Sequence, residues 1–300
     1  MLQQTRVETV IPYYERFMHA VPNIEALAQL DEGRLLKLWE GLGYYSRAKS
    51  LQKAARTVVE KHGGVFPRDF DDIRRLPGIG DYTAGAIASI CFGSPTPAVD
   101  GNVLRVVSRL IGCTDDIADS KVKSRFGTML AKIYPADRTG DFTQSLMELG
   151  AIVCLPGSRA KCGLCPLAAL CAANAEGTQS ALPVKSGRAP RKKEQKTVFI
   201  LHCGDLTAVR RRDKSALLGG LFEFPNAEGQ LTVAEAAMQL ARWGVQTETM
   251  SSGIRKKHIF THIEWHRRVC AADVSIDVLP SGWVYLDESH ALPTAYKVCL

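Results

Sequence analysis

Apolar residues recur at helical spacing through the first part of the chain. From Met1 to about residue 175 the spacing stays near 3.6 residues, and prolines and glycines interrupt the runs. The opening run places six residues on one predicted face: Leu2, Val7, Val10, Ile11, Tyr14 and Phe17. Because residues 1–4 offer no Ser, Thr, Asp or Asn as a cap, we expect the first helix to be under way where this sequence begins. The pattern predicts an all-α domain over residues 1–175.

The pattern changes to that of strands after residue 197. Short runs rich in β-branched and aromatic residues cover 197–203, 206–212, 258–265 and 267–276. One helix interrupts them, because Thr232 and Glu235 form a capping box ahead of apolar positions at helical spacing. These features predict an α+β domain over residues 197–300. Residues 176–196 between the two domains form a predicted linker, which is basic through Lys185, Arg188, Arg191, Lys192, Lys193 and Lys196.

Composition narrows the class of protein without naming a function. A length of 300 residues exceeds that of the usual single domain, which agrees with two domains. With 46% hydrophobic and 23% charged residues, the chain is not of the disordered, collagen-like or coiled-coil class. No apolar stretch approaches the length of a membrane span and no signal peptide is recognisable, so we expect an intracellular protein. The net charge of +7 favours a polyanionic partner, but only weakly.

A glycine-rich turn, Leu-Pro-Gly-Ile-Gly, stands at residues 76–80 just before a helical run. Its two glycines allow a tight turn with bare amides, and the N-terminus of the next helix adds a positive dipole. Such a turn can hold a DNA phosphate without a charged side chain, as in a helix-hairpin-helix motif. The alternative interpretation is an ordinary turn between two helices.

A second motif, Asp100-Gly101-Asn102, follows the turn along the chain. An aspartate in this setting is first of all a helix N-cap. Downstream of a phosphate-binding turn, the same carboxylate could also meet the sugar of a flipped nucleotide. There its negative charge would stabilise an oxocarbenium-like cation.

Four of the nine cysteines crowd into one short segment: Cys154, Cys162, Cys165 and Cys171. Four thiolates can hold a [4Fe-4S] cluster or a zinc ion, and their spacing does not choose between the two. We expect the other five cysteines to be small buried hydrophobic residues: Cys91, Cys113, Cys203, Cys270 and Cys299.

Taken in order, these motifs resemble those of helix-hairpin-helix DNA glycosylases with an iron–sulfur loop, and above all the adenine DNA glycosylase (MutY) family. The similarity covers nearly the whole chain, through residues 1–5, 41–48, 76–80, 100–102, the cysteine loop, 218–225 and 260–262. It implies a glycosylase domain with a [4Fe-4S] loop, followed by a Nudix-like domain that recognises the lesion. The implied reaction removes adenine paired with 8-oxoguanine or guanine in duplex DNA, by base flipping and hydrolysis of the N-glycosidic bond.

The resemblance also implies catalytic residues. Asp100 would stabilise the sugar cation, with Asn102 and Tyr82 in support. Endonuclease III-like glycosylase/lyases have a lysine at the position of Tyr82. Because a tyrosine cannot form the Schiff base that leads to strand cleavage, the resemblance implies a monofunctional enzyme.

The same resemblance implies a set of DNA contacts. Gln4 and Tyr44 would wedge into the duplex where the adenine leaves, Thr5 would lie beside the lesion, and Gln144 would face the flipped adenine. The hairpin would add Leu76, Gly78 and Gly80. Lesion recognition would fall to Phe260, Thr261 and His262.

The sequence departs from the family pattern in three places. The family's catalytic glutamate would lie just upstream of Met1, so we expect this chain to be N-terminally truncated and impaired as an enzyme. The gap from Cys154 to Cys162 is one residue longer than usual in the family. Thr261 stands where the family has a serine, so its preference for the lesion is expected to be weaker.

Other classes of function remain open from the sequence. One is a non-catalytic module that binds 8-oxoguanine or mismatched DNA, and another is an endonuclease III-like glycosylase. An iron–sulfur electron carrier is disfavoured, because it would need neither a phosphate-binding hairpin nor a basic linker. For the leading hypothesis we expect a monomer in the bacterial cytoplasm, associated with the nucleoid, with contacts to other repair proteins through the linker.

Overall fold

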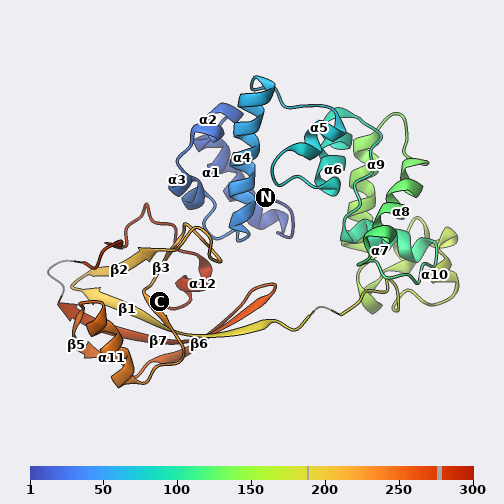
Figure 1. Cartoon of the computed structure of the whole chain (residues 1–300). Helices are drawn as coiled ribbons and strands as arrows, with labels where there is room; N and C mark the ends of the chain where they lie inside the picture. Colours follow the sequence, from blue (N-terminus) through green and yellow to red (C-terminus); the bar gives the residue numbers. More distant parts are fainter. Residues whose placement is uncertain (188, 276–278) are drawn as a thin grey trace. The chain divides into compact units, whose positions relative to one another are not determined.

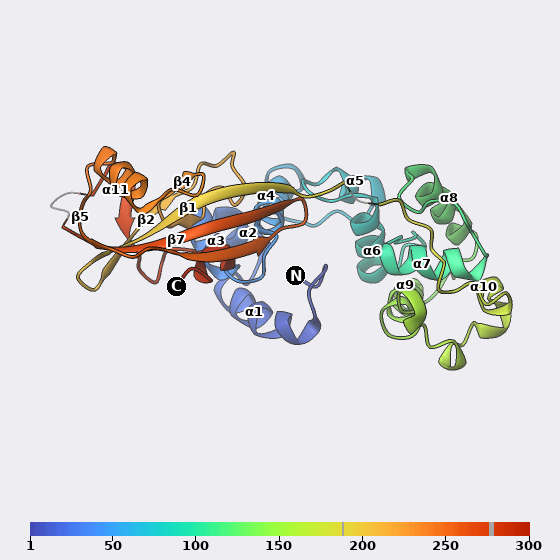
Figure 2. The ribbon, with the colours of Figure 1, turned by 90° about the horizontal axis from the view of Figure 1, so that it is seen from below.

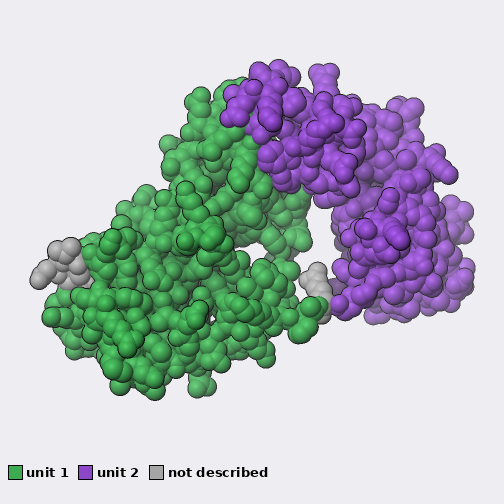
Figure 3. Space-filling view, in the orientation of Figure 1, with its two compact units in different colours: residues 1–56, 189–300 green, residues 57–188 purple. Residues whose placement is uncertain are grey.

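The computed structural model describes residues 1–187, 189–275 and 279–300 (Figure 1). Its contacts divide the chain into two compact units, one of Met1–Arg56 with Ala189–Leu300 and one of Thr57–Arg188 (Figure 3). The predicted boundaries of the two domains and the linker stay a prediction. Arg188 of the linker and Ile276 at the end of the last predicted strand lie outside the described residues.

The first unit begins with helices α1 (Val7–Ala20), α2 (Ile24–Gln29), α3 (Glu32–Leu38) and the start of α4 (Tyr45–His62). The expectation of a helix from the first residue is wrong. The Thr5 amide closes a turn onto Leu2, and Gln4 has a φ of 64°, which a right-handed helix does not accommodate. Helix α1 therefore starts at Val7, after Arg6, whose side chain provides no cap.

The six apolar residues predicted for one face of this segment do not share one environment. Val10 and Phe17 are buried, whereas the other four are exposed: Leu2, Val7, Ile11 and Tyr14. The prediction of a single buried apolar face is wrong for two reasons. Part of the run precedes the helix, and α1 buries only a narrow stripe of its surface in the core.

The rest of the first unit is a mixed sheet with one helix on each face (Figures 1 and 2). Strand β1 (Lys192–Cys203) pairs in parallel with β7 (Ile263–Ser275), and β5 (Gln246–Met250) and β6 (Ile254–Ile259) lie antiparallel to β7. Strands β2 (Leu206–Arg211) and β4 (Asn226–Glu228) pair with β1. Strands β3 (Phe222–Glu223) and β8 (Trp283–Tyr285) pair with β2.

Alternate residues of β1 reach the two apolar cores of this sheet. Val198 and Ile200 join the core beneath α12 (Thr294–Lys297), and Phe199 and Leu201 join the core beneath α11 (Val233–Arg242). The capping box of Thr232 and Glu235 is confirmed at the start of α11. Strand β1 begins at residue 192 rather than 197, because residues 192–196 pair with 263–267 of β7.

The second unit is helical. It contains the end of α4, then α5 (Phe70–Arg75), α6 (Asp81–Phe92), α7 (Gly101–Leu110), α8 (Ser120–Ala131) and α9 (Thr139–Glu148). A π turn (Leu149–Val153) and short 3₁₀ turns (Gly157–Arg159, Cys162–Leu164, Ala168–Leu170) lead to α10 (Ala172–Ala175). The fold class expected from the sequence, a helical domain followed by an α+β domain, is confirmed. Among the described residues, no helix is long and apolar enough to cross a membrane.

The five cysteines outside the cluster segment do not all behave as expected. Cys113, Cys270 and Cys299 are buried, as predicted for small hydrophobic side chains. Cys91 is exposed, and Cys203 is only partly buried. The expectation was wrong for Cys91, because residue 91 falls on the outer face of α6.

Helix α6 packs closely against the segment that leads to Asp100. A Cβ atom added to Gly85 would lie 2.2 Å from the carbonyl oxygen of Pro97. The variant Gly85→Ala is therefore expected to lower the free energy of unfolding by about 1–3 kcal/mol, measured by urea denaturation. In the control Gly127→Ala on α8, the new Cβ would be 3.9 Å from its neighbour, and helix propensity predicts a small gain instead. Equal effects of the two variants would contradict this interpretation.

Candidate active site

The glycine turn at residues 76–80 connects α5 and α6 as the sequence predicted. Gly78 has a φ of 78°, and Gly80 is the N-cap of α6 without any side chain to bond the first amides. Gly78 and Gly80 are exposed. Leu76 is only 2% exposed, so its side chain anchors the turn in the unit rather than facing solvent. The turn presents a helix N-terminus and bare backbone to solvent, which suits an anion.

Asp100 is the N-cap of α7, and both of its carboxylate oxygens accept a hydrogen bond. Oδ1 accepts from the Val103 amide at 2.8 Å, and Oδ2 accepts from the side-chain amide of Asn102 at 3.0 Å. The side chain is half-buried. These two donors hold the carboxylate in one orientation, so that a developing positive charge would meet it already in place.

Arg105 anchors Asn102 to the following part of the chain. Its guanidinium donates to the Asn102 side-chain oxygen at 2.9 Å and to the carbonyls of Gly150 and Cys154 at 2.6 and 2.7 Å. Burial, the largest influence, lowers the pKa of Arg105. No role for Arg105 was predicted from the sequence. Its i, i+3 spacing from Asn102 was the available signal.

The helices that carry the remaining predicted residues of this unit pack together. Helix α6 carries half-buried Tyr82, α9 carries exposed Gln144, and α9 packs against both α6 and α7. A buried hydroxyl pair fixes the contact of α6 with α9, since the Thr143 side chain donates to that of Ser89 at 2.8 Å. Tyr82, Asp100 and Gln144 therefore come from three adjoining helices of one unit.

All four clustered cysteines line one small cavity, of about 30 Å³. Among the residues that the structure describes, no three His, Cys, Asp or Glu side chains gather closely enough for a single metal ion. In a [4Fe-4S] cluster each cysteine binds a different iron atom, so the sulfurs stand further apart than around one zinc ion. The four thiols that line this cavity are the donor set of either group.

Arg109 holds this cysteine segment against α7. Its side chain is 2% exposed and donates to the carbonyls of Leu155, Gly157 and Leu182, and to Cys154 Sγ at 3.3 Å. A buried cation beside a sulfur favours the negative charge that a metal-bound thiolate carries. No local pattern indicates a role for Arg109, since its partners lie far along the chain.

Replacing Arg109 by methionine is expected to release the cysteine segment from α7. The loss of a charged donor to buried carbonyls should lower the stability of the unit by about 2 kcal/mol and reduce the metal bound per chain. Thermal denaturation and elemental analysis of the purified chain measure both effects. The matched control is Arg159→Met, which replaces an exposed arginine of the same segment. Retained metal in Arg109→Met would contradict the role given to this side chain.

Gln4 and Tyr44 of the first unit share an unusual backbone conformation. Gln4 has a φ of 64° and Tyr44 a φ of 47°, in the left-handed region that non-glycine residues rarely adopt. Arg47 links their segments: it donates to the Gln3 carbonyl at 2.8 Å and lies 5.0 Å from the Tyr44 ring centre. Strain at exposed side chains is typical of functional positions. Thr5, half-buried, follows Gln4 directly.

Phe260, Thr261 and His262 form the tip of the hairpin between β6 and β7 (Figure 1). The Phe260 ring turns inward and stands edge-on to Trp265, with ring centres 4.8 Å apart. Thr261 and His262 are exposed. The hairpin thus presents a hydroxyl and an imidazole to solvent on a tip that an aromatic contact holds.

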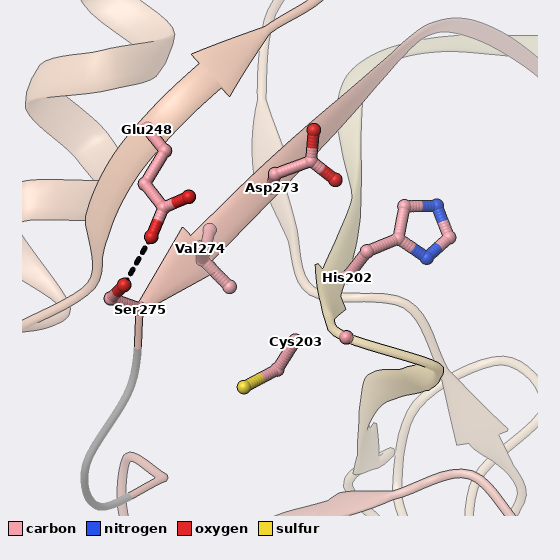
Figure 4. Close-up of a pocket in the computed structure, with 7 residues that line it drawn as sticks. His202, Cys203, Glu248, Asp273, Val274 and Ser275 are labelled. Carbon is pink, nitrogen blue, oxygen red and sulfur yellow. Dashed lines mark hydrogen bonds between the residues drawn. The ribbon is translucent and has the colours of Figure 1, made fainter.

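A cavity of about 530 Å³ lies elsewhere in the first unit, at the ends of three strands (Figure 4). Its lining includes Glu248, Asp273, His202 and Cys203. The Asp273 carboxylate accepts from the Thr249 hydroxyl at 2.6 Å, and that of Glu248 from the Ser275 hydroxyl. Both carboxylates are engaged in hydrogen bonds between strands β5 and β7. Since no predicted site residue lines the cavity, it is not part of the candidate site.

Comparison with protein families defines the class. Residues 1–132 match the HhH-GPD superfamily of base excision DNA repair proteins, and residues 197–300 match the NUDIX domain. A trapped endonuclease III–DNA covalent intermediate is 27% identical with a TM-score of 0.52, covering 59% of this chain and 81% of that one. A thermostable thymine-DNA glycosylase gives 27% identity and the same TM-score over 58% and 80% of the two chains. The fold is that of a helix-hairpin-helix repair protein followed by a Nudix domain.

Individual relatives narrow this class. Adenine DNA glycosylase of Buchnera aphidicola subsp. Acyrthosiphon pisum is 33% identical, over 89% of this chain and 75% of its own length. The human protein of that name is 34% identical over 99% of this chain, and the rat protein 35% over 88%. The chain belongs to the adenine DNA glycosylase family. It spans 65% of the human and 61% of the rat relative, so it is shorter than either.

Proposed function

We propose that the chain is a monofunctional adenine DNA glycosylase, which removes adenine paired with 8-oxoguanine or guanine from duplex DNA. One observation carries the proposal: Asp100 is held by Val103 and Asn102 at the N-terminus of α7, in the unit that also presents the hairpin at residues 76–80. A flipped nucleotide needs a grip on its phosphate and a negative charge beside its sugar. This unit offers both.

In this proposal the bond between the sugar and adenine breaks with its electron pair moving to the base. The sugar becomes an oxocarbenium-like cation that the Asp100 carboxylate stabilises, and water then adds to it. A proton must reach the purine as it leaves, which in the family is the task of a glutamate that precedes the segment matching Met1. Tyr82 stands where a lysine would make the enzyme a lyase, so no strand cleavage accompanies base removal.

The first unit would recognise the mispair. Gln4 and Tyr44 would enter the duplex at the vacated position, and the tip with Thr261 and His262 would contact the oxidised guanine. Unstacking costs a few kcal/mol per base step, which contacts to the bent DNA offset. Two observations support this division of tasks: the side chains of these four residues are exposed, and Gln4 and Tyr44 have a positive φ.

We also propose that Cys154, Cys162, Cys165 and Cys171 hold a [4Fe-4S] cluster rather than zinc. The cluster would supply a rigid cross-link of four chain positions next to α7, where Arg105 and Arg109 bond the same segment. The visible absorption of an iron–sulfur centre and iron analysis of anaerobically purified chain would test this. A colourless preparation that contains one zinc per chain would overturn it.

Adenine release tests the proposed activity. The assay uses duplexes with an 8-oxoguanine:adenine or a guanine:adenine pair. It compares two proteins: the chain from Met1, and the same chain extended at its N-terminus by the residues that the codons upstream of Met1 encode. Release of free adenine without strand cleavage by either protein supports the proposal. Tight binding to the mispair without release by both would favour the non-catalytic binding module, and strand cleavage would favour the endonuclease III-like alternative.

A further inference from the structure

Residues assigned to the lesion side of the DNA fall in one compact unit, although they lie at opposite ends of the chain. Gln4, Thr5 and Tyr44 belong to Met1–Arg56, and the hairpin tip with Thr261 belongs to Ala189–Leu300. Asp100 and the cysteine segment belong to the other unit. The contacts that join the N-terminal helices to the Nudix domain are therefore contacts within the predicted lesion-reading part.

An apolar core crosses this junction. Leu221 and Ala291 of the Nudix domain are buried together with Leu35 and Trp39 of the N-terminal helices. Leu218 packs against both this core and the core beneath α12. Two partly buried polar contacts lie at the edge of the same junction.

Glu40 forms the first of these contacts. Its Oε1 accepts from the Leu292 amide at 2.8 Å and lies 3.1 Å from Lys297 Nζ, and its Oε2 lies 2.8 Å from Lys37 Nζ. Lys37 also donates to the carbonyl of His290 at 3.1 Å. Burial raises the pKa of Glu40, but the hydrogen bonds from Lys37, the Leu292 amide and Lys297 outweigh it and hold the pKa below its ordinary value. One ionised carboxylate just after α3 thus contacts Leu292 and Lys297 near the C-terminal end of the chain.

Lys49 forms the second contact. Its Nζ donates to the Gly219 carbonyl at 2.8 Å and pairs with Glu32 at 2.9 Å. The next residue, Gly220, has a φ of 82°, and a Cβ there would come within 3.0 Å of Glu32 Oε1. The left-handed backbone at residue 220 favours glycine, and the Nudix domain contacts Glu32 of α3 and Lys49 of α4 at this turn.

We propose that Glu40 and Lys49 are positioning residues for lesion recognition. They hold the hairpin that carries Phe260, Thr261 and His262 at a fixed place relative to the segments of Gln4 and Tyr44. The proposal rests on the proposed function, in which both groups contact one base pair. Recognition that needs two separate elements at one base pair is lost when their relative position shifts by about 1 Å.

The test measures lesion preference, the ratio of the dissociation constants for guanine:adenine and 8-oxoguanine:adenine duplexes at one salt concentration. The variants are Glu40→Gln, Lys297→Met and Lys49→Met in the full chain. Each is expected to lower this ratio by about tenfold while the affinity for the guanine:adenine duplex changes little. The double variant Glu40→Gln/Lys297→Met should lose no more than the larger single loss, because both residues act through one contact. The control is Glu15→Gln on α1, which changes an exposed glutamate of the same helices.

The outcomes separate this inference from the proposed function. An unchanged ratio in folded variants overturns the positioning role, and so does an equal loss of affinity for both duplexes. An unaltered chain without any lesion preference overturns the specificity of the proposed function, and the positioning role with it. Thermal denaturation shows which variants fold. If Glu40→Gln does not fold, Lys297→Met still tests the inference, because this variant leaves the hydrogen bond from the Leu292 amide to Glu40 in place.

Discussion

Replacing Asp100 by asparagine is expected to slow adenine release at least about a hundredfold, in a form of the chain that shows this activity. Asparagine is also a good N-cap, so the bond from the Val103 amide and the start of α7 should survive. What disappears is the negative charge beside the sugar cation. Single-turnover assays on the 8-oxoguanine:adenine duplex measure the effect, which should fall on the rate and not on binding.

The chain offers a matched control for this variant. Asp119 is likewise the N-cap of a helix in the second unit, where it accepts from the Lys121 amide at 2.8 Å. Asp119→Asn makes the same chemical change at an exposed position away from the predicted site. If the two variants released adenine at the same rate, Asp100 would be a cap and nothing more.

The variant Glu223→Ala is expected to destabilise the first unit by about 3–5 kcal/mol, because it leaves two arginines without their carboxylate. Glu223 is 5% exposed, and its carboxylate pairs with Arg210 at 2.9 Å and with Arg212. It also accepts from the Tyr296 hydroxyl at 2.6 Å. Burial lowers the pKa of Arg210, the direction expected where a cation is partly removed from water.

Urea denaturation followed by tryptophan fluorescence measures this loss, since Trp265 lies in the same core. The control is Glu288→Ala, which removes an exposed glutamate from the same unit and should change stability by less than about 0.5 kcal/mol. A Glu223→Ala protein as stable as the control would show that this network adds nothing to the fold. Glu223→Gln should lie between the two, because its amide oxygen keeps one acceptor while its NH2 group faces donors and the charge is lost.

The candidate site was predictable wherever its chemistry depends on neighbours in the sequence. Gly78 takes the left-handed conformation that its turn requires, Asp100 caps α7, and Thr232 and Glu235 form the predicted capping box. The four cysteines line one cavity. Each of these features spans few residues, so residue type and spacing were sufficient to predict it. The roles of the individual site residues in the reaction stay predictions.

Other features depended on partners that no local pattern names. The start of β1 at Lys192 needs the neighbouring strand β7, and without it the basic segment has the pattern of a linker. Arg105 and Arg109 became part of the site only through carbonyls 45 to 73 residues away along the chain. The first helix begins at Val7, because a turn closed by Thr5 and Leu2 precedes it.

The sequence by itself determined the two fold classes, the hairpin, the cap at Asp100 and the cysteine segment, since backbone preference and hydrophobic period act over a few residues. Only the tertiary structure decided that the N-terminal helices and the Nudix domain form one unit, through Glu40, Lys49 and the core around Leu221. The reason is that burial of apolar surface and pairing of partly buried charge join residues far apart along the chain, such as Glu40 and Lys297, which are 257 positions apart. Local sequence therefore predicted the fold classes of this protein, and contact in space decided which parts of the chain form one unit.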